Sequence, residues 1–139
     1  MNADSKPTIS EEDYLERIYE LIQRKGYARP VEIAQELAIQ QPSVTKMVQN
    51  LDAKGYLTYE KYRGFSLTPK GEKLALAIRN RHGILASFLT MIGVNRSTID
   101  KDVEGIEHHI SPKTLTAISQ FVQFLQEQPA IIKAFLKQH

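Results

Sequence analysis

Apolar residues recur at helical spacing along the first third of the chain. The first block opens near Ser10, where Ser10 and Asp13 predict a capping box, and it ends at Gly26. Its apolar positions lie three and four residues apart, at Tyr14, Leu15, Ile18, Leu21 and Ile22. This spacing predicts an amphipathic helix with one face in a hydrophobic core.

Two shorter helices are predicted to follow. Pro30 is typical of a first helical turn, and a tight connection at 38–41 leads to a third helix with Pro42 near its start and Gly55 at its end. The positions expected to face inward are Val31, Ile33, Ala34 and Leu37 in the second helix, and Val44, Met47, Val48 and Leu51 in the third.

The hydrophobic period then changes. Residues 56–60 and 65–68 are rich in aromatic and β-branched side chains, and residues 61–64 have the composition of a turn, so we predict a two-stranded hairpin. Three helices followed by a hairpin is the order of a winged helix-turn-helix. In that arrangement the third helix enters the major groove of DNA.

The second half is predicted to be entirely helical. Thr68-Pro69 opens a long helix that runs to about 92, Ser97 caps a helix ending near 109–110, Ser111-Pro112 opens another, and a short last helix covers 130–138. The fold is therefore mainly α, with a winged helix-turn-helix domain at 1–70 and an all-helical dimerisation domain at 71–139. This half has more apolar surface than one small helical core requires, so we expect part of it to form a dimer interface. The residues concerned are Phe88, Ile92, Ile106, Ile110, Leu115, Ile118 and Phe121.

Composition restricts the class of protein. A chain of 139 residues can hold one compact domain, or a small domain with an oligomerisation element. The absence of cysteine excludes disulfides and thiolate metal sites. The sequence has neither a long apolar run nor a signal-peptide core at its start, so we expect a cytoplasmic protein without a membrane partner.

Charge is distributed unevenly between the two halves. Residues 21–81 carry 11 Lys and Arg against 5 Asp and Glu, a balance of +6, whereas residues 97–128 carry 2 against 5, a balance of −3. A basic half favours a polyanion and an acidic half favours a cation.

The predicted third helix and hairpin carry side chains suited to DNA. Ser43, Lys46 and Asn50 share one face of the helix, Thr45 and Gln49 flank them, and the hairpin tip offers Lys61 and Arg63. Short polar side chains and single cations are what base edges and phosphates bind. Arg29, at the start of the second helix, is a further candidate for a phosphate contact. The alternative is an ordinary solvated helix face.

A candidate metal site lies in the acidic half. Glu104, Glu107 and His108 have the spacing that places them together on one face of a helix. Carboxylate and imidazole ligands without sulfur suit Mn²⁺ or Fe²⁺ better than a thiolate zinc site. His82, Asp13 and Glu16 are ligand types as well, but from the residues alone a core histidine and helix-capping carboxylates are the more usual explanation.

Several segments resemble the diphtheria toxin repressor family, and specifically its manganese-responsive members. They are EDYLERIY (12–19), GYA (26–28), SVTKMV (43–48), YEKYRG (59–64) and DVEGIEHH (102–109). The resemblance extends over nearly the whole chain. It implies a homodimer that binds palindromic operator DNA and represses metal-uptake genes when metal is bound, with no organic substrate.

The resemblance also implies a metal site of six ligands: Asp13, Glu16, His82, Glu104, Glu107 and His108. This site would hold two Mn(II) ions per subunit, with Fe(II), Zn(II), Cd(II) or Co(II) as substitutes. Iron-responsive relatives have methionine in place of Asp13 and cysteine in place of Glu104, so the two carboxylates favour the harder manganese ion. The SH3-like third domain of those relatives is expected to be absent.

Three alternatives remain at this point. The chain could be an iron- or zinc-responsive repressor of the same family, or a winged-helix regulator that senses an organic ligand. An enzyme is the third, and we do not expect one: di-iron oxidases use two Glu-x-x-His motifs, which this chain lacks, and nucleophile-elbow, phosphate-loop and HExxH patterns are absent too.

Overall fold

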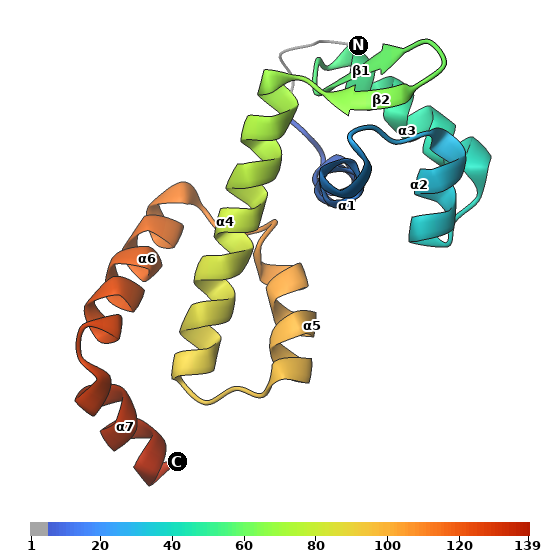
Figure 1. Ribbon diagram of the computed structural model, residues 1–139. Helices are drawn as coiled ribbons and strands as arrows, with labels where there is room; N and C mark the ends of the chain where they lie inside the picture. Colours follow the sequence, from blue (N-terminus) through green and yellow to red (C-terminus); the bar gives the residue numbers. More distant parts are fainter. Residues whose placement is uncertain (1–5) are drawn as a thin grey trace. The chain divides into compact units, whose positions relative to one another are not determined.

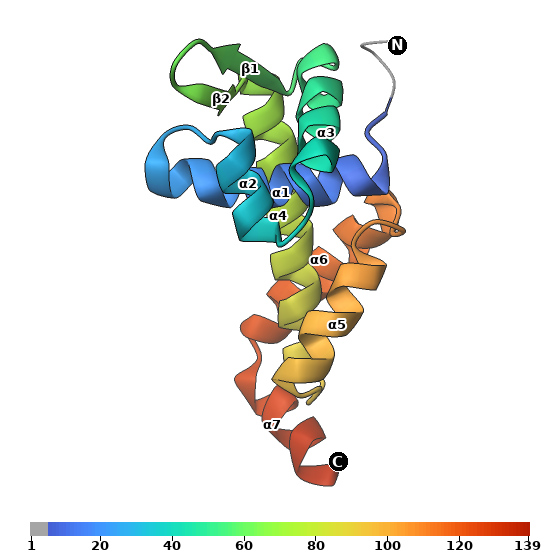
Figure 2. The same ribbon diagram turned by 90° about the vertical axis from the view of Figure 1, so that its right-hand side faces the viewer.

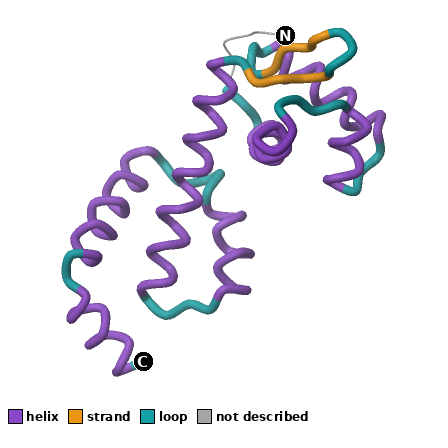
Figure 3. The backbone as a smooth tube through the Cα atoms, in the orientation of Figure 1, coloured by secondary structure: helices purple, strands orange, loops and turns teal. Residues whose placement is uncertain are grey.

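A computed structural model of the protein describes residues 6–139 (Figure 1). Residues 1–5, part of the segment expected to lack a signal peptide, lie outside the described part. The chain forms two compact units, Met1–Ile78 and Arg79–His139. The elements in chain order are α1 (Ile9–Lys25), α2 (Pro30–Leu37), α3 (Gln41–Ala53), β1 (Leu57–Glu60), β2 (Gly64–Leu67), α4 (Pro69–Met91), α5 (Arg96–Ile106), α6 (Pro112–Gln126) and α7 (Pro129–Gln138). Helices dominate, and one small sheet accompanies them (Figure 3), so the expected fold class is confirmed.

The first unit is a three-helix core closed by a hairpin, and Figure 2 shows its helices from the side. The apolar stripes of α1 and α3 interlock, with Leu15, Ile18, Val44 and Leu51 almost completely buried. Val31 is an exception to the predicted pattern. It is 44% exposed, because the core face of the short helix α2 consists of Ile33 and Ala34, with Leu37 packed against the same core.

The start of α1 differs from the prediction. Thr8, not Ser10, caps the helix: its hydroxyl accepts a hydrogen bond from the Glu11 backbone N–H, and the Glu11 carboxylate accepts one from the Thr8 backbone N–H. This reciprocal pair is a capping box two residues earlier than expected. It leaves Asp13 free of a capping role.

The hairpin is held to the segment before α2. β1 and β2 pair antiparallel, and Ala28 forms an isolated bridge to Phe65 with N–O distances of 2.9 and 2.7 Å. Gly64 makes this approach possible. Its φ is +120°, and a Cβ atom there would lie 2.6 Å from the carbonyl oxygen of Ala28.

The second unit has a core between α4, α5 and α6. Leu85, Ile99 and Val103 are buried at its centre, and Ile110, Leu115 and Ile118 pack against them. Asn95, not Ser97, caps α5 through a hydrogen bond from the Thr98 backbone N–H, and Ser111 caps α6 as predicted. α5 ends at Ile106, three to four residues earlier than expected.

Part of the predicted dimer surface is internal to the protomer. Ile110, Leu115 and Ile118 belong to the unit's own core, and Phe88 packs its ring against Phe121. The large apolar side chains that are exposed on this unit are Ile92, Ile106, Phe121, Phe124, Ile131, Phe135 and Leu136. Within residues 6–139, helices that combine enough length and hydrophobicity to cross a membrane are absent.

Candidate metal centre and nucleic-acid interface

The second unit brings two histidines to one buried carboxylate. Glu107 occupies the C-cap of α5 and is 0% exposed. Its Oε2 lies 3.0 Å from Nδ1 of His82 on α4, and its Oε1 lies 3.5 Å from Nε2 of His108. Residues 25 positions apart in the sequence thus meet because α5 ends beside α4.

The electrostatics of Glu107 favour a cation. Burial raises the pKa of this carboxyl above its ordinary value of 4.5, and the hydrogen bond with His82 only partly offsets the effect. Oε1 is buried without a hydrogen-bond partner among the described residues. A buried oxygen with an unused lone pair is costly unless another group binds it.

The donor set around Glu107 therefore fits a divalent metal ion. It consists of carboxylate oxygen and imidazole nitrogen, the ligands that first-row divalent ions accept. When bound, such an ion would supply the positive charge that this buried carboxylate lacks. His82 and His108 lie beside Glu107 in this unit and could hold the ion together with it.

Glu104 occupies a different environment from Glu107. It is exposed on α5 and lines a shallow hollow together with His82, Ser97, Asp100 and Lys101. The helix that was expected to carry Glu104, Glu107 and His108 as far as 109–110 ends at Ile106, with Glu107 as its C-cap in helical conformation and His108 in the turn that follows. Glu107 lies four residues after Val103 and eight after Ile99, so it continues the buried face of α5.

Asp13 and Glu16 belong to the first unit. Both lie on α1, three residues apart, and both are half-buried. Asp13 Oδ1 is 3.8 Å from Nε of Arg17, an ion pair open to solvent. The two carboxylates therefore present oxygen ligands from one stretch of α1.

The outer face of α3 is polar and accessible. Ser43, Lys46 and Gln49 are exposed, whereas Thr45 and Asn50 are half-buried. A shallow hollow at the start of the helix is lined by Gln41, Pro42, Thr45, Lys46 and Gln49. This face offers hydroxyl, amide and ammonium groups without a large apolar side chain.

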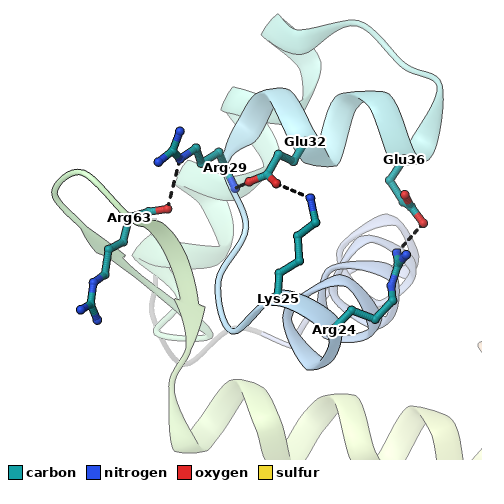
Figure 4. Close-up of polar contacts among 6 residues, drawn as sticks. All are labelled: Arg24, Lys25, Arg29, Glu32, Glu36 and Arg63. Atoms are coloured by element: carbon teal, nitrogen blue, oxygen red, sulfur yellow. Dashed lines mark hydrogen bonds and ion pairs between the residues drawn. The ribbon is translucent and has the colours of Figure 1, made fainter.

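The tip of the hairpin carries basic and aromatic side chains, and hydrogen bonds from Arg29 hold its backbone. Lys61 and Arg63 are exposed, and the Lys61 ammonium lies 5.2 Å from the ring centre of Tyr62. Arg29 donates hydrogen bonds to the backbone carbonyls of Tyr62, at 3.2 Å, and of Arg63, at 3.5 Å. In Figure 4 the Arg63 side chain points away from Arg29 while its carbonyl faces it. Arg29 therefore supports the hairpin tip, a role that its candidacy as a phosphate contact did not anticipate.

A buried ion pair in the first unit was also not anticipated. Glu11 and Lys54 lie 2.6 Å apart with side chains only 4% and 6% exposed. The signal was present in the sequence: Glu11 continues the core spacing of Leu15, Ile18 and Ile22 toward the N-terminus, so a charged residue occupies a core position of α1.

Comparisons with known proteins agree with these two units. The family model "Iron dependent repressor, N-terminal DNA binding domain" matches residues 7–65, and "Iron dependent repressor, metal binding and dimerisation domain" matches residues 68–135. A protein of Lysinibacillus sphaericus named HTH-type transcriptional regulator MntR is 55% identical over 127 residues, which are 91% of each chain. A protein of the same name from Listeria welshimeri is 53% identical over 128 residues, covering 92% of this chain and 90% of the relative.

Solved structures show the same fold. The manganese regulator SloR matches with a TM-score of 0.71 and 28% identity, and the apo form of the manganese-activated repressor ScaR matches with 0.71 and 32%. The alignments cover 86% and 79% of this chain, which spans only about half of those two chains, 55% and 53%. The chain belongs to the iron-dependent repressor family and is a metal-dependent transcriptional repressor, with a DNA-binding domain followed by a metal-binding and dimerisation domain.

Proposed function

We propose that this protein is a manganese-responsive repressor whose homodimer binds palindromic operators of metal-uptake genes when Mn(II) is present. The observation that carries the metal dependence is Glu107, a fully buried carboxylate with two histidines beside it and one oxygen that lacks a hydrogen-bond partner among the described residues. It lies in the segment that matches a metal-binding domain. The protein acts in the cytoplasm and catalyses no reaction.

The proposed site has six ligands: Asp13, Glu16, His82, Glu104, Glu107 and His108. It takes two Mn(II) ions per subunit, and four carboxylates are enough negative charge to balance two divalent ions. Hard oxygen ligands support manganese over softer metals, as does the similarity to proteins described as a manganese regulator and a manganese-activated repressor. Equilibrium dialysis with metal analysis tests the stoichiometry, and one ion per subunit at saturation would refute it.

Metal and DNA are coupled through the ligands of α1. Without metal, the carboxylates repel one another and favour a loose arrangement. A cation that binds these carboxylates links α1, which carries Asp13 and Glu16, to the metal-binding domain. A dimer reads two half-sites only when its recognition helices are about 34 Å apart or a multiple of that spacing, so metal shifts the population toward that state.

The DNA-binding residues in this proposal are Ser43, Thr45, Lys46, Gln49 and Asn50 of α3, with Lys61 and Arg63 at the hairpin tip. The exposed face of α3 and the supported position of the hairpin tip both favour this assignment.

An operator-binding titration tests the proposal. The probe is a duplex selected from random-sequence DNA by the manganese-loaded protein, and binding is followed by fluorescence anisotropy in buffered Mn(II) or in chelator. We expect weak binding in chelator and a large gain with Mn(II). Full-strength binding in chelator would refute the metal dependence and support a repressor that senses another ligand.

An iron- or zinc-responsive repressor is the second candidate, favoured by the family's description and by the similar structure of ScaR with bound Zn²⁺, which is 31% identical with a TM-score of 0.74. Zn(II) binds most nitrogen and oxygen sites more tightly than Mn(II) does. The operator affinity that each metal produces, rather than the affinity for the metal itself, therefore distinguishes a manganese-responsive from a zinc-responsive repressor. We expect Mn(II) at saturation to give tighter operator binding than Zn(II) does. Equal or tighter binding with Zn(II) would favour the second candidate.

A further inference from the structure

Helix α1 has two faces with different functions. Successive residues of a helix turn by about 100°, so Glu11 lies on the core face with Leu15 and Ile18, while Asp13 and Glu16 project from the opposite side. The core face packs in the interior of the first unit. A metal ion that binds Asp13 and Glu16 therefore acts on a helix whose opposite face is packed in the core of the DNA-binding unit.

Glu11 connects α1 to the end of the recognition helix α3. Its Oε1 accepts a hydrogen bond of 2.6 Å from Nζ of Lys54, which is the C-cap residue of α3. The same oxygen accepts the Thr8 backbone N–H of the capping box at 2.8 Å. Lys54 Nζ also lies 3.4 Å from the backbone carbonyl oxygen of Lys6. The contact is thus charged, short and sheltered from water.

The other end of α1 is connected to α2 by contacts of a weaker kind. Arg24 pairs with Glu36 and Lys25 pairs with Glu32, each at 2.6 Å, and both contacts are exposed to solvent (Figure 4 shows the two pairs). Exposed ion pairs contribute little, because water solvates both charges. Removing one partner of a buried pair has a much larger effect, since it leaves an uncompensated charge.

We propose that Glu11 and Lys54 are positioning residues that transmit metal binding on α1 to the recognition helix α3. The inference rests on the proposed function, because it takes Asp13 and Glu16 as metal ligands. The Glu11–Lys54 pair makes α1 and the end of α3 move as one body when metal is bound. Without the pair, the protein still binds metal and still folds, but metal no longer sets the position of α3.

Substitutions can remove this pair while largely keeping the size and shape of each side chain. Glu11→Gln retains an acceptor for the Thr8 backbone N–H, since glutamine also completes a capping box. Lys54→Met retains the aliphatic chain without the ammonium group. The double variant Glu11→Gln/Lys54→Met leaves no unpaired buried charge, and Lys54→Arg preserves the charge. Lys25→Met removes an exposed pair on the same helix and is the matched control.

The readout is the factor by which saturating Mn(II) strengthens operator binding, measured with the selected duplex in Mn(II) and in chelator. Such coupling factors are typically about 5–150-fold, and we expect Lys54→Met, Glu11→Gln and the double variant to retain about a third of the wild-type factor or less. We expect Lys25→Met and Lys54→Arg to keep most of the wild-type factor. Thermal melting verifies that each variant is folded.

The double variant separates positioning from stability. If the pair were merely structural, removing both charges together would restore wild-type behaviour, since no unpaired buried charge remains. Recovery of both the melting temperature and the coupling factor in the double variant would therefore overturn the proposal. A wild-type coupling factor in Lys54→Met would overturn it as well. If the wild-type protein itself shows no gain with Mn(II), the proposed function fails, and that result is distinct from a failure of the Glu11–Lys54 pair alone.

Discussion

The substitution Glu107→Gln should affect metal-free and metal-bound stability differently. In the absence of metal, Glu107 has one oxygen hydrogen-bonded to His82 and one that is buried without a hydrogen-bond partner within residues 6–139. Glutamine keeps an acceptor for His82 and removes a carboxyl whose charge is penalised by burial. We therefore expect the free energy of unfolding in chelator to stay within about 1 kcal/mol of wild type, or to rise.

Manganese should lose its stabilising effect on this variant. A ligand at 100 times its dissociation constant stabilises the folded state by about 2.7 kcal/mol. For a chain of this size, 1 kcal/mol corresponds to roughly 3–4 °C in the midpoint. We expect Mn(II) to raise the midpoint of the wild type by about 8–10 °C, and that of Glu107→Gln by a small fraction of this.

Differential scanning calorimetry at constant protein concentration measures both effects. Glu127→Gln is the matched control, because Glu127 is an exposed carboxylate at the C-cap of α6 in the same unit. An unchanged manganese-induced rise in Glu107→Gln would refute the reasoning. A large loss of stability in chelator would also refute it, because it would show that Glu107 is a structural group in its own right.

The remaining predictions concern pH, the hairpin and DNA. Mn(II) affinity should fall from pH 7.5 to pH 5.5, because burial raises the pKa of the Glu107 carboxyl above 4.5 and this carboxyl must release its proton to bind the ion; equal affinities by calorimetric titration would contradict this. Gly64→Ala places a Cβ atom 2.6 Å from the Ala28 carbonyl oxygen. It should therefore destabilise the protein by about 1–3 kcal/mol in urea unfolding, and a neutral effect would show that the approach is not tight. Lys46→Ala and Arg63→Ala should each reduce the slope of log affinity against log salt by about 1 if the side chain contacts phosphate, and an unchanged slope would exclude that contact.

The order of the elements was predictable because local signals determine it. The core positions of α1 and α3 follow from residues spaced three and four apart, and glycine or proline marks most of the boundaries. Where two signals compete, local reasoning fails. Thr8 and Ser10 each precede an acidic residue by three positions, so each could form a capping box. Thr8 caps the helix, and its acidic partner, Glu11, also pairs with Lys54.

The metal centre was only partly predictable. Carboxylates and histidine within 104–108 indicated a cation site, and the spacing from Ile99 and Val103 places Glu107 on the buried face of α5. The contact between Glu107 and His82 depends on the approach of α4, which is not encoded in the local spacing. His82 is ordinary by itself, and its contact with a residue 25 positions away is a property of the folded unit. The support that Arg29 gives to the hairpin has the same origin.

A metal-controlled repressor requires a free-energy coupling between metal and operator, and this coupling is reciprocal. The most direct test is the affinity for Mn(II) measured twice, for the protein alone and for the protein saturated with the selected operator duplex. We predict that the operator-bound protein binds Mn(II) more tightly, by the same factor with which Mn(II) strengthens operator binding. Identical Mn(II) affinities with and without operator would contradict a metal-controlled repressor.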